Sequence, residues 1–91
     1  MKLKIQAVNF EIASQLEKFI EKKTDRFARH LQPDDEIEVK MTVVKPATNM
    51  NKETQVRIGT MFADKTCDTF EEGLSACLEA LEKQLEKRKN Q

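Results

Sequence analysis

Residues 37–44 read IEVKMTVV, and this stretch decides the fold class because its side chains alternate in character. Every second residue from 37 to 43 is apolar, and the residues between them are polar. A period of two is typical of a strand that buries one face and exposes the other. The stretch therefore predicts a strand in a sheet with one covered side.

The segments upstream add a strand and a helix. Residues 3–8 alternate in the same way and predict a first strand. From about Ala13 to residue 31 the apolar residues follow helical spacing, and Pro33 ends the helix. Ser14 followed by Glu17 predicts a capping box at its start.

Downstream, residues 54–60 and 61–66 predict two more strands after a polar turn or loop over 46–52. Gly59 is a candidate tight turn or bulge between them. Asp68 and Thr69 open a second helix, with cap-and-acid spacing from Asp68 to Glu71. The order β-α-β-β-β-α predicts an α+β, two-layer domain. We expect a four-stranded, mostly antiparallel sheet with two helices on one face.

Composition limits the function classes. The 91 residues suffice for one domain, and 16 basic residues balance 16 acidic ones. Zero net charge argues against binding to nucleic acid by bulk charge, so any polyanion site must be a local patch. No apolar run reaches the ~20 residues of a membrane span, and the start lacks a signal peptide's apolar core. We expect a soluble, cytoplasmic protein.

The residues that usually carry catalysis or cofactors are sparse. Cys67 and Cys77 match no common zinc signature, and His30 has no second ligand at metal-binding spacing. Gly59 and Gly73 are the only glycines, so the chain has no glycine-rich phosphate loop. The sequence predicts a non-enzyme with no cofactor, no metal and no small-molecule substrate.

The charged residues are segregated on both predicted helices. On a helical wheel the first helix carries its acids on one flank and its bases on the other. The second helix has an acidic flank with Lys83 and Lys87 beyond it, and its last turn adds Arg88 and Lys89. Two interpretations remain open: a phosphate-binding surface, or solvated faces joined by helical ion pairs.

Aromatic residues favour some kinds of RNA recognition over others. The chain has no Trp or Tyr, and its five phenylalanines fall mostly at core positions. Stacking of single-stranded bases is therefore disfavoured. Recognition of folded RNA by shape and phosphate contact stays open.

Six segments, in this order and spacing, resemble the ribosome hibernation-promoting factors, also called ribosome-associated inhibitor A or subunit-interface proteins. They read LxIxAxN from residue 3, LxxFIxxK from 16, VVK from 43, FADK from 62, DTFEE from 68 and LxKQLxKxK from 81. The resemblance covers essentially the whole chain. It implies a fold like that of a double-stranded-RNA-binding domain. It also implies a non-enzymatic stress or stationary-phase factor that blocks the tRNA and mRNA channel of the small ribosomal subunit.

The resemblance also implies partners and contact residues. The partners are the small subunit and its rRNA, with ribosomal proteins and a separate ribosome-pairing factor as further candidates. Basic residues would contact rRNA; carried over by position, they are Lys23, Arg26, Lys40, Lys45, Lys83, Lys87, Arg88 and Lys89. The helical wheel adds Lys22 and Arg29.

Some features depart from the family pattern. The net charge is low for an rRNA binder, and Ala13 stands where the family often has Thr, so capping is expected to shift to Ser14. The sequence ends at Gln91, so we expect the short form without a C-terminal ribosome-dimerisation domain. Two alternatives remain: a small α+β protein-interaction or ligand-binding module that does not act on the ribosome, and a general double-stranded-RNA binder.

Overall fold

The computed structural model describes residues 2–44 and 50–89, except for the side chains of residues 88 and 89. The predicted order β-α-β-β-β-α is confirmed, with a short 3-10 turn after the first helix. The elements are β1 (Lys2–Val8), α1 (Ser14–Phe27), η1 (Ala28–His30), β2 (Glu36–Val43), β3 (Lys52–Ile58), β4 (Met61–Cys67) and α2 (Phe70–Lys89).

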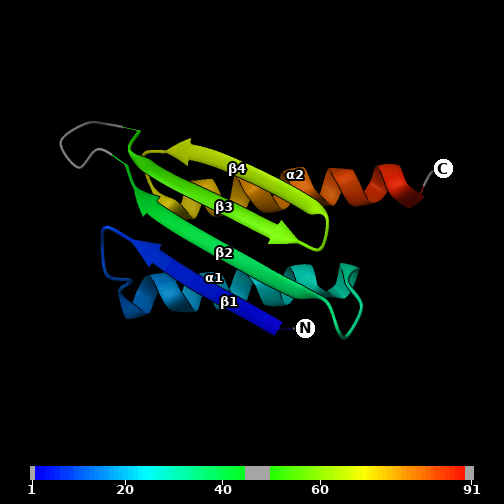
Figure 1. Cartoon of the computed structure of the whole chain (residues 1–91). Coiled ribbons are helices and arrows are strands. Elements are labelled where there is room, and N and C mark those ends of the chain that lie inside the picture. The colour runs from blue at the N-terminus through cyan, green and yellow to red at the C-terminus, as the bar shows by residue number, and fades with distance from the viewer. Residues whose placement is uncertain (1, 45–49, 90–91) are drawn as a thin grey trace.

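The four strands form one sheet in the order β1-β2-β3-β4. β1 runs parallel to β2 because α1 carries the chain back across the sheet, whereas β2, β3 and β4 pair antiparallel in succession. Figure 1 looks onto the open face of the sheet, with both helices behind it; α1 lies on the β1–β2 side and α2 on the β3–β4 side. The predicted two-layer α+β fold is therefore confirmed.

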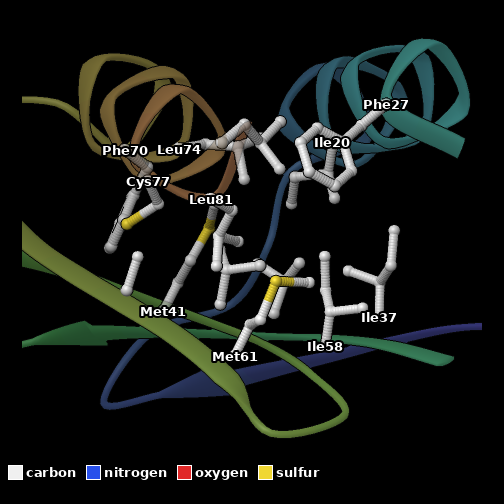
Figure 2. Close-up of a cluster of buried hydrophobic side chains, with 14 residues drawn as sticks. Ile20, Phe27, Ile37, Met41, Ile58, Met61, Phe70, Leu74, Cys77 and Leu81 are labelled. Carbon is white, nitrogen blue, oxygen red and sulfur yellow. The ribbon is translucent and has the colours of Figure 1, made fainter. Parts of the chain in front are cut away.

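The core lies between the sheet and the helices (Figure 2). Ile37, Val39 and Met41 are buried there, as the alternation along residues 37–43 predicts. Helix α1 contributes Ile20 and Phe27, and α2 contributes a longer stripe. That stripe consists of Phe70, Leu74, Cys77, Leu78 and Leu81. Two opposed amphipathic surfaces thus account for the fold's hydrophobic burial.

Both helix starts differ from the predicted capping. Ala13 is the N-cap of α1, and no side chain caps that end, so the Ser14–Glu17 capping box is wrong. Ser14 already lies inside the first turn, one residue too late to cap it. At α2, Thr69 Oγ1 accepts a hydrogen bond from the Glu72 backbone N–H at 3.2 Å, so the cap is Thr69 rather than Asp68.

Asp68 has a different role. Its Oδ1 accepts a hydrogen bond from the Met50 backbone N–H at 2.7 Å, which ties the start of α2 to the segment before β3. Asn9 makes a comparable tie at the other side of the sheet. Its φ of 69° lies in the left-handed region that Asn tolerates, and its side-chain amide donates to the Val43 carbonyl at 3.2 Å.

Each glycine occupies a position that suits it. Ile58 faces Met61 across the ladder, so Gly59 and Thr60 form a two-residue hairpin loop. Gly59 has a φ of 60°, which confirms the predicted tight turn. Gly73 lies at a close approach of α2 to β3, because a Cβ added there would be 2.7 Å from Thr54 Oγ1.

Candidate nucleic-acid interface

The basic flank of the first helix faces a shallow groove between the two helices. Lys23, Arg26 and Arg29 lie three residues apart, so the helical repeat brings them to one side of α1 and η1. With His30 they form one wall of the groove, whose volume is about 190 Å³. The floor includes the buried side chains of Phe27 and Leu78.

Most of this flank carries unneutralised charge. Among the residues that the structure describes, no ion pair joins Lys22, Arg26 or Arg29 to a carboxylate. All three are exposed. Lys23 is half-buried, and its Nζ lies 5.5 Å from the centroid of the Phe19 ring, a cation–π distance that holds the ammonium at the apolar margin. The flank thus presents a cluster of cations that are available to an anion.

The opposite wall of the groove is acidic. Ser75, Glu79 and Glu82 of α2 line it, and Glu82 Oε1 lies 3.7 Å from His30 Nε2. Glu79 Oε1 lies 3.9 Å from Lys83 Nζ, an exposed i,i+4 pair that contributes little stability. The basic flank of α1 therefore borders the acidic flank of α2, and the basic edges of the two helices do not adjoin here.

The basic end of α2 lies elsewhere. A 20-residue helix is ~30 Å long, whereas a strand of 7 residues spans ~23 Å, so the last turns of α2 extend past the sheet (Figure 1). Lys87 is exposed on these turns. Arg88 and Lys89 belong to the same helix, but their side chains lie outside the described part, as does the whole of Lys45.

Lys40 lies on the open face of the sheet, away from both helices. There it lines a groove of about 640 Å³ with neighbours that the sequence analysis did not single out: Lys4, Gln6, Glu38, Gln55, Arg57 and Phe62. Phe62 is 43% exposed, whereas the other four phenylalanines lie in or against the core, as predicted for most of them. The signal was present in the sequence, because alternation with the inward Met61 and Ala63 turns Phe62 outward.

Cys77 is a core residue whose thiol is held in its protonated form. Cys77 is buried against β3, and its Sγ donates to the Thr54 carbonyl at 3.4 Å. Burial raises the pKa of the Cys77 thiol to about 12, so it stays protonated and unreactive at neutral pH.

Across residues 2–44 and 50–89, no group of three or more His, Cys, Asp or Glu side chains is placed to hold a metal ion. Within the same residues, neither helix is long and apolar enough to cross a membrane.

Comparison with known proteins gives one consistent match. The family model described as Sigma 54 modulation protein / S30EA ribosomal protein matches residues 3–91. A ribosomal subunit interface protein from Coxiella burnetii has a similar structure, with a TM-score of 0.78, 20% identity and complete coverage of both chains.

The N-terminal domain of Thermus thermophilus Protein Y is similar as well. Its TM-score is 0.76 at 15% identity, over 96% of this chain and 98% of that one. At these identities the likeness supports the shared fold. No curated protein sequence matches the chain.

Proposed function

Because the chain belongs to the Sigma 54 modulation protein / S30EA ribosomal protein family, we propose that it is a non-enzymatic ribosome hibernation factor. It would bind the small ribosomal subunit in the channel used by tRNA and mRNA, and thereby block translation under stress or in stationary phase. The solved protein from Coxiella burnetii, which has this fold, is named a ribosomal subunit interface protein. The family match is the observation that carries the proposal.

The charge distribution supports contact with rRNA through the helices. Lys22, Arg26 and Arg29 are exposed and have no carboxylate partner among the described residues, so their charges are available to phosphates. Lys23 borders them at the groove, and Lys87 is a separate exposed cation near the far end of α2. A protein of zero net charge can bind a polyanion in this way because its acids are gathered on other flanks.

The binding free energy would come largely from counterion release. Each phosphate neutralised by a Lys or Arg releases condensed cations, so the logarithm of the affinity falls linearly with the logarithm of the salt concentration. Recognition would depend on the shape of folded rRNA, because helix-borne lysines and arginines contact phosphates without reading the bases. The acidic flank of α2 would orient the protein by avoiding phosphates and facing basic ribosomal proteins.

The test is co-sedimentation of the purified protein with vacant small subunits over a series of salt concentrations. We expect salt-sensitive pelleting for the wild-type protein. The double variant Arg26→Glu/Arg29→Glu should bind more weakly, with a salt slope lower by about two because two phosphate contacts are lost.

A matched control changes the net charge equally. Lys2→Glu/Lys65→Glu alters two exposed strand residues and should pellet like the wild type. Equal loss in both variants would show a dependence on net charge alone and contradict the helix assignment. Absence of wild-type pelleting at low salt would contradict ribosome binding itself. Equal affinity for an unrelated A-form duplex would instead identify a general double-stranded-RNA binder.

A further inference from the structure

The open face of the sheet, opposite the helices, carries two aligned rows of outward side chains. The strand register places Lys4, Glu38, Arg57 and Phe62 side by side in one row across the four strands. The neighbouring row consists of Gln6, Lys40, Gln55 and Asp64. All but Asp64 line the groove of about 640 Å³, and no element covers this face in Figure 1.

Phe62 gives this face an exposed aromatic ring. It is the one phenylalanine that the structure leaves 43% exposed, whereas the other four are buried or half-buried. The guanidinium carbon of Arg57 lies 5.8 Å from the centroid of the ring. An aromatic ring beside an arginine on a sheet surface is an arrangement on which a nucleobase can stack, as in four-stranded sheets that bind RNA.

The charge of the groove suits a polyanion. Three cations, Lys4, Lys40 and Arg57, line it against the single carboxylate of Glu38. Lys4 is already engaged, because its Nζ lies 3.1 Å from Glu36 Oε1, and this hydrogen-bonded pair raises the pKa of Lys4. Among the described residues Lys40 and Arg57 have no ion pair, so their charges are available to a bound anion.

The acids around the groove restrict how a ligand can lie. Asp64 on β4 and Glu53 on β3 occupy the β3–β4 side of the face, and Glu53 Oε1 accepts a hydrogen bond from the Gln55 side chain at 2.9 Å. Phosphates would avoid that side and lie toward Lys40 on β2. Glu38, beside Arg57 in its row, can accept a hydrogen bond from an exocyclic amino group, as acidic side chains do from cytosine.

We propose that this open face binds one or two nucleotides of single-stranded RNA. A base stacks on Phe62, Arg57 and Lys40 contact the adjoining phosphates, and Glu38, two strands from Phe62 on β2, binds the base edge of the next nucleotide. The inference goes beyond the proposed ribosome contact, because it uses the face opposite α1 and requires no ribosome. It also reverses the expectation from sequence that base stacking is disfavoured.

The experiment measures fluorescence anisotropy of a fluorescein-labelled octacytidylate RNA with the full chain at low salt. We expect saturable binding that Phe62→Ala weakens roughly tenfold, because one stacked base is lost. Phe62→Leu keeps an apolar side chain and should weaken binding to a similar degree, whereas Phe62→Tyr should retain it. Lys40→Gln should lower the salt slope by about 0.7, the value for one contact to a single strand, and Lys65→Gln should leave it unchanged.

Backbone amide NMR shifts locate the binding site directly. Shifts that gather on the outward residues of β2, β3 and β4 support the proposal. Shifts confined to α1 and α2, or equal affinity of the wild type and Phe62→Ala, overturn it. Absence of wild-type binding also overturns it.

The two proposals fail separately. Arg26→Glu/Arg29→Glu should keep its affinity for the octanucleotide but bind small subunits more weakly. Phe62→Ala should show the opposite: weaker octanucleotide binding and unchanged pelleting with small subunits. If small-subunit pelleting persists while octanucleotide binding is absent, only the open-face proposal is wrong.

Discussion

Replacing Gly73 with Ala tests whether the close approach of α2 to β3 requires a glycine. Two opposing effects can be estimated. Alanine is favoured over glycine inside a helix by about 1 kcal/mol. The new Cβ, however, would lie 2.7 Å from Thr54 Oγ1 and 3.2 Å from Thr54 Cβ. Thr54 is fully buried on β3, and its own Cβ is part of the contact, so a change of rotamer cannot remove the overlap.

The estimated balance is unfavourable. Overpacking a close-packed core costs about 1–3 kcal/mol, and the contacts at Gly73 fall in the upper part of that range because a β-strand backbone would have to move. After the gain in helix propensity, we expect Gly73→Ala to lower the free energy of unfolding by about 1–2 kcal/mol.

Two substitutions at residue 54 isolate the cause. Thr54→Ala removes the Thr54 hydroxyl and methyl groups, which leaves space for the methyl group that Gly73→Ala adds. In this background the loss of stability caused by Gly73→Ala should fall by about 1 kcal/mol or more. Thr54→Val keeps the branched shape, so the cost should persist. The free energies come from urea unfolding followed by circular dichroism, with a check that the m-values agree.

Two results would refute this reasoning. One is a Gly73→Ala variant as stable as the wild type. The other is an equal cost of Gly73→Ala in the Thr54→Ala and Thr54→Val backgrounds, because steric overlap with the threonine side chain could then not be the cause.

Four further predictions concern Thr54, the helix caps and the two cysteines. Thr54→Val alone should raise the free energy of unfolding by about 1 kcal/mol in urea titrations, because Thr54 Oγ1 is buried and has no hydrogen-bond partner among the described residues. A loss of stability would reveal a partner. Thr69→Ala should cost about 1 kcal/mol by the same method and Ser14→Ala only tenths, because only Thr69 caps its helix; equal costs would contradict the assigned caps. In native protein at pH 8, a thiol reagent should modify half-buried Cys67 and spare Cys77 until unfolding. The Cys77 thiol ionises above about pH 9 in the unfolded chain, whereas in the folded protein its pKa is about 12 and it stays neutral. The free energy of unfolding should therefore fall by up to about 1.4 kcal/mol per pH unit between pH 9 and 12. The variant Cys77→Ala should lack this slope.

The layers of the fold were predictable because the repeats of strand and helix are local. Alternation along residues 37–43 identified the buried face of β2, and the cap and turn residues identified where other elements begin within a residue or two. The exact caps were not predictable, because Ala13 and Ser14 differ by one position and tertiary contacts decide which one starts the helix. Thr24 was not predicted as a core residue because threonine is polar. It can be buried because its hydroxyl donates a hydrogen bond to the Ile20 carbonyl at 2.8 Å.

The candidate interface was predictable only within single elements. Helical periodicity alone gathers Lys22, Arg26 and Arg29 on one flank. Which flank of α2 faces them depends on how α2 is rotated on the sheet, and the structure turns Glu79 and Glu82 toward the groove. Rotation of a helix on a sheet follows from packing across layers, which no single segment of sequence contains.

The strand order also affects whether two molecules can join their sheets. β1 and β4 are the outer strands, and an outer strand offers unpaired backbone groups to any second copy. In a symmetric antiparallel pairing of two β1 strands centred on Leu3, Lys2 of each copy would lie opposite Lys4 of the other, and like charges opposite each other destabilise a ladder. At β4, helix α2 occupies part of the strand edge. The Gln84 side chain donates to the Phe62 carbonyl at 3.3 Å, so this carbonyl is already bonded and less available to a neighbouring strand. Sheet extension, the first step of strand-mediated aggregation, is thereby disfavoured at both edges.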